Sequence, residues 1–228
     1  MDWQNIFFVA STWACPVLIA VTFHEAAHGW IANLLGDDTA KRFGRVTFNP
    51  FKHIDLFGTI FLPALLLLGS GGRLMFGFAK PVPVNYGNLR NPKQDMIWVA
   101  LAGPASNLLL AFVSVLVLHL FSSTAYVIGD WFMLNLFNSI KINILLFVFN
   151  LLPIPPLDGG RILAGLLPLS CQDYFIKLEK MGFLIIISGF FFLPLIGEFL
   201  GIPINLFWWL VGEPSEFIMR KIFNVPFN

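Results

Sequence analysis

The sequence has little charge for its length of 228 residues. Charged residues make up 12% of it, whereas about 25% is typical of a soluble domain. Hydrophobic residues make up 57%, and 26 of them are phenylalanine. A water-soluble globule needs more polar surface than this. The composition therefore excludes that class and indicates a protein for which lipid is part of the solvent.

Three further scarcities exclude other classes. The net charge is +1 and the chain has no basic stripe, so no nucleic-acid partner is expected. The two cysteines, Cys15 in an apolar run and Cys171 in a polar connection, indicate structural thiols and no disulfide framework. The first five residues carry Asp2 and no Lys or Arg, which is the wrong flank for a secretion signal. We therefore expect the N-terminal segment to be retained.

Long apolar runs are what the sequence does have. Residues 6–23 carry no charge, and their helical pattern continues to about residue 35. Similar runs cover residues 96–121, 131–152 and 181–197. At about 1.5 Å per residue, each is long enough to cross a bilayer core of about 30 Å as a helix.

Three other segments are apolar but shorter or broken. Residues 56–69 predict a re-entrant or partly buried helix, because they are too few for a full crossing. Residues 204–219 contain Glu213, Pro214 and Glu216, so this stretch either crosses the membrane or lies on its surface. In Phe76–Asn85, alternating Phe, Val and Pro predict an extended edge segment. The expected fold is an all-α polytopic membrane protein, a bundle of about 4–6 transmembrane helices with a small re-entrant β or extended segment.

Basic residues predict an orientation. Loops 36–93 and 158–180 hold nearly all the Lys and Arg that lie between the apolar runs, whereas residues 122–130 hold none. The positive-inside rule therefore predicts that both loops are cytosolic and that the N-terminus is outside. Lys141 lies within the third run, so we expect it to snorkel outward or to mark a later start of that crossing.

His24-Glu25-Ala26-Ala27-His28 matches the pattern HExxH. Positions i and i+4 share one face of a helix, so both imidazoles can reach one zinc ion. Glu25, one position further round, can activate a water molecule without occupying a coordination site. Two histidines and a glutamate inside an apolar crossing are costly unless they are paired or bind a metal, which favours a zinc site.

A catalytic zinc usually takes a third protein ligand. Asp158 follows an apolar run and a Pro-rich segment. This segment can run extended beside the helix that carries the histidines and direct the Asp158 carboxylate at the zinc. Alternatively, Asp158 is a solvated residue in a membrane-exit turn. His53, with Asp55 close by, is the competing ligand, although its basic loop predicts a surface position. His119, near the outer end of its run, is expected at the membrane interface.

Three motifs together resemble the site-2 protease family of intramembrane zinc metalloproteases, in its compact form without a PDZ or CBS domain. They are HEAAH in the first crossing, AGPASN at 102–107 and NLLPIPPLDGG at 150–160, and FAKPVPVN at 78–85 adds to them. The resemblance covers about residues 5–168. It implies one single integral-membrane protease domain over 1–228, with a catalytic core at about 5–168 and C-terminal helices at about 172–221.

The resemblance also implies roles for single residues. His24, His28 and Asp158 would bind one zinc ion, which decides against His53, and Glu25 would be the catalytic base. Asn107 and Asn150 would line the active site and hold the substrate or the developing oxyanion. The alternative for Asn107 is an interhelical hydrogen bond beside a close contact at Gly103.

The expected activity is hydrolysis of a peptide bond in or near a transmembrane helix of a membrane-protein substrate, by a zinc-activated water. The expected location is the lipid bilayer of a prokaryotic plasma membrane, as a multi-pass protein with its active site nearer the cytosolic face. A membrane metal-binding or zinc-transport protein and an inactive protease-like scaffold are the alternatives. Glu25 argues against both, since neither needs that carboxylate.

The edge of Phe76–Asn85 could pair with an unwound substrate, although Pro81 and Pro83 limit its hydrogen bonds. The sequence predicts no oligomeric state, and without a PDZ or CBS domain it leaves regulation open.

Overall fold

The computed structural model describes residues 3–61, 79–121, 129–168 and 181–225, together with the single positions 65, 77 and 178. Four helices within these residues are long and apolar enough to cross a membrane. They are α1 (Trp3–Leu34), α4 (Pro92–Phe121), α6 (Asp130–Asn150) and the helix Met181–Phe199, which ends in η5 (Ser188–Phe192) and α9 (Leu193–Phe199). The four predicted crossings are therefore confirmed as helices.

Shorter helical elements connect and extend these four. Residues 206–222 are helical, and they pack against α6. The short elements are α2 (Thr39–Arg42), η1 (Pro50–Lys52), η2 (Leu56–Phe61), η3 (Tyr86–Asn88), α7 (Asp158–Leu166), η6 (Trp208–Gly212), α10 (Glu213–Phe217) and η7 (Ile218–Ile222).

The long helices are not broken at their prolines. Helix α1 runs through Pro16, and α4 runs through the Gly103-Pro104 pair that interrupts its apolar run. Helix α1 ends where Gly36 adopts a φ of +116°, a conformation open to glycine, and the Asp37 amide donates to the Ala32 carbonyl at 2.9 Å. The chain reverses at this turn, and α2 packs against α1.

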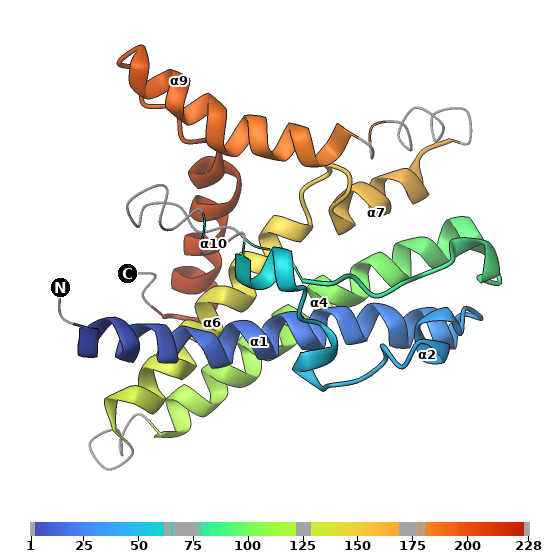
Figure 1. Cartoon of the computed structure of the whole chain (residues 1–228), viewed down its shortest axis with the longest axis horizontal. Coiled ribbons are helices and arrows are strands. Elements are labelled where there is room, and N and C mark those ends of the chain that lie inside the picture. Colours follow the sequence, from blue (N-terminus) through green and yellow to red (C-terminus); the bar gives the residue numbers. More distant parts are fainter. Residues whose placement is uncertain are drawn as a thin grey trace.

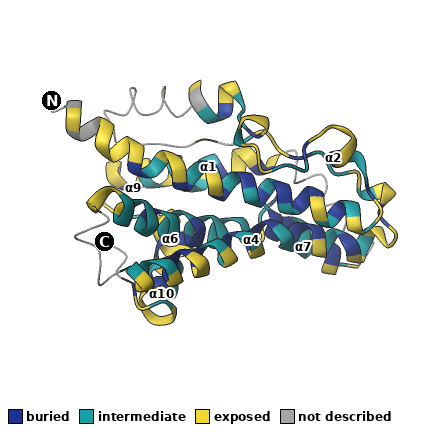
Figure 2. Cartoon of the chain, turned by 90° about the horizontal axis from the view of Figure 1, so that it is seen from below, coloured by how far each residue is buried: buried dark blue, intermediate teal, exposed yellow. Residues whose placement is uncertain are grey.

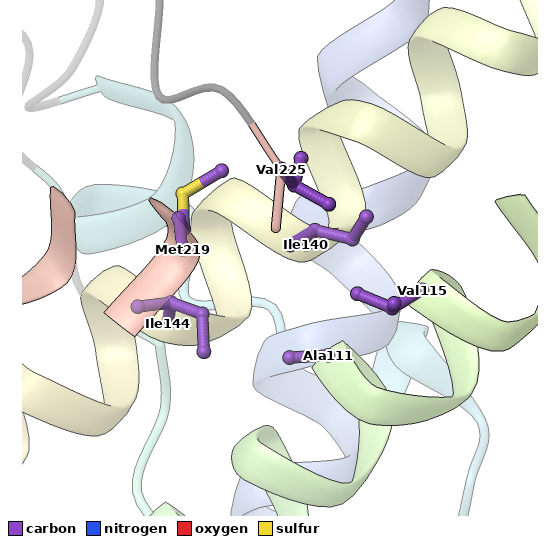
Figure 3. Packing of buried hydrophobic residues seen from close by; sticks show 6 residues of the cluster. All are labelled: Ala111, Val115, Ile140, Ile144, Met219 and Val225. Carbon is purple, nitrogen blue, oxygen red and sulfur yellow. The ribbon is translucent and has the colours of Figure 1, made fainter. Parts of the chain in front are cut away.

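Helix α4 is central in the bundle and packs against α1, α6 and α7 (Figure 1). Its contact with α6 buries an apolar cluster, to which the C-terminal segment adds two residues (Figure 3). Buried residues line the inner faces of α1, α4 and α7, whereas the outward faces are exposed (Figure 2). Many exposed side chains are large and apolar, such as Phe7 and Leu120, each 71% exposed. Lipid would cover such faces in a membrane-spanning bundle. The residues of the cluster are Ala111, Val115, Ile140, Ile144, Met219 and Val225.

The predicted β element is absent from the residues that the structure describes, none of which forms a strand. Residues 79–85 are irregular, and Phe76 and Phe78 lie outside the described part. Pro81 and Pro83 have no N–H to donate to a ladder. The neighbouring amides of Val82 and Asn85 donate to side-chain carboxylates instead.

The predicted re-entrant helix at 56–69 is described only in part. Residues 56–61 form η2, whereas 62–64 and 66–69 lie outside the described residues.

Candidate metal centre

Three side chains from two distant parts of the chain meet inside the bundle. His24 and His28 lie one turn apart on α1, and Asp158 is the first residue of α7. The Nε2 atoms of the two histidines are 3.1 Å apart. Asp158 Oδ2 lies 3.2 Å from His24 Nε2 and 3.4 Å from His28 Nε2. All three residues are buried. This arrangement is a group that could hold a metal ion.

The tautomer of His28 follows from its second ring nitrogen. His28 Nδ1 lies 2.7 Å from the backbone oxygen of Val99 in α4. A carbonyl oxygen can only accept, so Nδ1 must carry the proton and donate it. In the neutral imidazole, Nε2 then presents a bare lone pair to the cluster.

The tautomer of His24 also follows from the partner of its Nδ1 atom, once the oxygen end of the Asn107 carboxamide is known. His24 Nδ1 lies 2.6 Å from Asn107 Oδ1. The other end of that carboxamide, Asn107 Nδ2, donates to the Ala20 carbonyl at 3.2 Å, which fixes which end is oxygen. His24 Nδ1 therefore donates to Asn107, and its Nε2 also presents a lone pair.

With both imidazoles in these neutral tautomers, the three converging atoms are acceptors. Asp158 Oδ2 is buried and accepts no hydrogen bond within the described part of the chain. Three electron pairs that converge without a proton between them are unfavourable unless a cation joins them. Two imidazole nitrogens and one carboxylate oxygen suit zinc, and they leave a fourth coordination position open. The residues present therefore fit a catalytic zinc ion.

Gly103 lets α4 approach the two imidazoles. A Cβ atom at this position would lie 2.4 Å from His28 Nε2 and 2.6 Å from His24 Cε1. No larger residue fits without displacing the histidines. The close contact expected at Gly103 is thus made with the metal-binding side chains themselves.

The segment before Asp158 explains how its carboxylate reaches the cluster. Residues 151–157 form turns and not the predicted extended chain, because the first turn of α7 packs directly on them. A Cβ at Gly159 would lie 2.2 Å from the Leu151 carbonyl oxygen, and one at Gly160 would lie 2.6 Å from the Pro155 nitrogen. Asp158 is only 5% exposed, so it is not the solvated residue of a membrane-exit turn.

Glu25 lies half-buried beside the histidines on α1. Its Oε2 accepts a hydrogen bond from the Val82 amide at 2.7 Å. The Val82 side chain packs one turn further along α1, where a Cβ added to Gly29 would lie 3.0 Å from Val82 Cγ1. The irregular segment 79–85 therefore lies against the face of α1 that carries Glu25.

The other candidate residues lie in different surroundings. His53 is 2% exposed and donates from Nε2 to the Thr47 carbonyl at 2.9 Å, so the predicted surface position is wrong: its loop folds back over the ring. The metal-binding group does not include His53. Asn150 is half-buried and donates to the Leu146 carbonyl of its own helix at 3.0 Å. His119 is exposed near the end of α4.

Sequence reasoning missed three partners of the site, namely Val82, the Val99 carbonyl and Asn143. Val82 and Val99 act through their backbones, which leave no mark in the sequence. Asn143 Oδ1 accepts from Asn107 Nδ2 at 2.9 Å. Its signal was available, since a carboxamide in an apolar run is costly unless it has a partner.

Comparison with known proteins gives one family. The family described as "Peptidase family M50" matches residues 12–133 and 128–193. "Putative zinc metalloprotease YwhC" of Bacillus subtilis is 41% identical over 178 residues, which cover 76% of this chain and 77% of that protein. "Putative zinc metalloprotease Rip2" of Mycolicibacterium smegmatis is 30% identical over 170 residues, which cover 75% of this chain and 62% of that protein. No solved structure matches the chain.

Proposed function

The chain belongs to peptidase family M50, the site-2 protease family, and we propose that it is a zinc-dependent intramembrane endopeptidase. Its substrates would be membrane proteins cut in or near a transmembrane helix. The observation that carries this proposal is the convergence of the His24, His28 and Asp158 acceptors on one buried point beside Glu25. A transport site or an inactive scaffold has no need of Glu25 there, which is the feature that favours the enzyme.

In this proposal His24 and His28 bind the metal through Nε2, and Asp158 binds it through Oδ2. Zinc, when bound, would act as a Lewis acid that brings the pKa of a water molecule down to about 7. The protein groups around it orient both imidazoles and hold a proton on each Nδ1. The Nδ1–H bonds to Asn107 and to the Val99 carbonyl hold the rings in place and make the Nε2 atoms better ligands.

Glu25 is proposed as the general base. A carboxylate next to the reacting water can take its proton and later deliver it to the leaving amine. The hydrogen bond from the Val82 amide occupies Oε2 and leaves Oε1 to contact that water. Val82 thereby restricts the rotation of Glu25, which favours one orientation of the base.

Asn107 and Asn150 are proposed to act at the same site in different ways. All three hydrogen-bonding groups of the Asn107 side chain are used, by His24, Ala20 and Asn143, which supports a positioning role on His24. Asn150 remains a candidate to hold the substrate or the oxyanion. Its half-buried amide at the end of α6 lies eight residues before Asp158 and has a second N–H to donate.

The helices and the charges support a membrane setting for this activity. The four long helices make a multi-pass membrane protein the natural context. We propose a prokaryotic plasma membrane, one protease domain over 1–228 with its core at about 5–168, and an active site nearer the cytosolic face. His28 lies close to the C-terminal end of α1, after which Lys41, Arg42 and Arg45 follow.

The test compares the purified wild type with Glu25→Gln on a model transmembrane substrate in detergent or vesicles. We expect both proteins to bind one equivalent of zinc, and cleavage by the variant to fall by about 10²–10⁴-fold, the usual contribution of a general base. Glu198→Gln makes the same chemical change at an exposed position of α9 and should cleave normally. Equal cleavage by Glu25→Gln would exclude the base, and a wild type that binds no zinc would exclude a metalloprotease.

A further inference from the structure

A chain of buried and half-buried polar groups continues from His24 between α4 and α6. Asn107 Nδ2 donates to Asn143 Oδ1 on α6 at 2.9 Å, and Asn143 Nδ2 donates to the Ser139 carbonyl at 2.9 Å. The Ser139 hydroxyl then lies 2.8 Å from that of Ser114 on α4. Asn107 and Asn143 are both 0% exposed. Two helices thus supply the groups that lie behind the metal-facing imidazole.

We propose that Asn143 is a positioning residue for the metal centre. By fixing the orientation of the Asn107 carboxamide, it keeps the proton of His24 on Nδ1 and the lone pair of Nε2 directed at the metal. The inference rests on the proposed metal site, and it adds a residue that contacts neither the metal nor its ligands.

Groups that can only accept set the orientation of both carboxamides. A carboxamide can rotate by 180° and exchange its oxygen and nitrogen, so its orientation is set by its neighbours. The Ser139 carbonyl accepts only, which places Asn143 Nδ2 toward it and Asn143 Oδ1 toward Asn107. Asn107 must then present Nδ2 to Asn143 and Oδ1 to His24.

The Ala20 carbonyl also holds Asn107, but at the longer distance of 3.2 Å. The Asn143 bond, at 2.9 Å, is the shorter of the two. Without it, a flipped Asn107 becomes less unfavourable. A flipped carboxamide would donate to His24 Nδ1 and so move the proton of the ring to Nε2, where it would occupy the position of the metal.

Among the described hydrogen bonds of Asn143, the one further polar group is the Ser139 hydroxyl, 3.4 Å from Asn143 Nδ2. Ile140 and Ile144 lie beside it along α6, and Figure 3 shows them packed in the cluster that includes Ala111 and Val115 of α4. Leucine at position 143 offers Asn107 Nδ2 no acceptor in place of Asn143 Oδ1, and a buried N–H that loses its partner is costly. Replacing Asn143 therefore acts directly on Asn107.

The same helix provides a matched control. Asn138 is also a buried asparagine of α6, and its Nδ2 donates to Thr12 on α1, to the carbonyl and to the hydroxyl, both at 3.1 Å. None of its described hydrogen bonds leads to His24. Asn143→Leu and Asn138→Leu each remove a buried interhelical amide, but only the first should reach the metal.

The experiment measures Co²⁺ and Zn²⁺ affinity of the full chain in detergent, with the visible spectrum of bound Co²⁺ as a report on ligand geometry. We expect Asn143→Leu to weaken binding by roughly tenfold, at the lower end of the effect of groups that orient a metal ligand. Asn138→Leu should bind within about twofold of the wild type. Equal weakening by both variants would overturn the proposal and indicate a general packing effect.

A second measurement reads the His24 tautomer directly, and its first result comes from the wild type. The ¹⁵N shifts of the histidine rings in the metal-free wild type report which nitrogen carries the proton, and His24→Gln assigns the His24 signal. We expect His24 to be the Nδ1–H tautomer, and to become a mixture in Asn143→Leu. A wild-type His24 protonated on Nε2 would overturn the inference. If the wild type binds no metal at all, the proposed function fails. If it binds metal but the two leucine variants behave alike, only the role of Asn143 fails.

Discussion

Asp37 and Asp158 are both buried, yet their carboxylates have opposite hydrogen-bond environments. Asp37 is 0% exposed, and its two oxygens accept from the Thr39 amide at 3.1 Å, the Asn88 side chain at 3.0 Å and the Asn85 amide at 2.7 Å. Asp158 Oδ2 accepts nothing within the described part of the chain and faces two imidazole lone pairs.

The difference separates a structural carboxylate from the proposed metal ligand. Donors surround Asp37 and join the end of α1 to the loop at 85–88, so its charge is compensated within the protein. Burial alone would raise the pKa of Asp37, but the hydrogen bonds from Thr39, Asn85 and Asn88 hold it below the ordinary value. Asp158 Oδ2 has no such donor within the described residues, which suits the metal-ligand role proposed for it. Three changes test this contrast.

The largest effect is expected from Asp158→Asn. The amide has nearly the same shape but no negative charge, so zinc affinity should fall by more than about 100-fold, and cleavage should be lost with it. In the metal-free state the new N–H can donate to an imidazole Nε2, so the apparent melting temperature should not fall. Zinc content after dialysis and melting curves with a chelator measure both effects. A variant that keeps a full equivalent of zinc would contradict the ligand role and bring His53 back into consideration.

The next effect is expected from Gly103→Ala. By helix propensity alone, alanine in the middle of α4 would stabilise the helix by about 1 kcal/mol. At this position, however, its Cβ would lie 2.4 Å from His28 Nε2, so the imidazoles must move. We expect zinc affinity to fall at least about tenfold, which is the size of effect seen when ligand orientation is lost.

Gly189→Ala is the control for that change. Gly189 is also helical, but within the described residues its added Cβ would meet the flexible end of Leu206, at 3.2 Å. This variant should bind zinc as the wild type does. Normal zinc binding by Gly103→Ala would mean that α4 can move away from the histidines at little cost.

Local patterns in the sequence were enough to predict part of the site and most of the fold. The four crossings follow from run length, and the pairing of His24 with His28 follows from their i, i+4 spacing. Spacing alone could not choose between Asp158 and His53, because both are distant in the chain and the choice depends on tertiary structure. The resemblance favoured Asp158, in agreement with the geometry.

The errors have a common physical origin. Charge counting placed His53 at the surface, but a charged loop can still fold back and bury one ring against the Thr47 carbonyl. The alternating residues of 76–85 favoured an extended edge segment; its described residues 79–85 form no strand, and the amides of Val82 and Asn85 bond to Glu25 and Asp37. Hydrophobic periodicity reports local structure, so it cannot predict a hydrogen bond to a carboxylate or carbonyl that is distant in the sequence.

The smallest effect is expected from Asp37→Asn, which should leave zinc binding unchanged. The amide can satisfy only some of the donors around it, so the free energy of unfolding should fall by about 1–3 kcal/mol, the cost of a buried unsatisfied group. Melting curves in detergent with a chelator present measure this loss without a contribution from the metal.

The pH dependence of this loss has a definite sign. The folded pKa of Asp37 lies below its ordinary value of 3.8, so the stabilisation by its carboxylate is present above that value. It disappears as the pH falls from 3.8 through the lowered folded pKa, because the folded state then takes up the proton as well. The difference in melting temperature between wild type and Asp37→Asn should therefore be constant near neutral pH and shrink below about pH 4. A difference that grew on acidification would mean that the donors around Asp37 favour its protonated form, and the contrast with Asp158 would then be wrong.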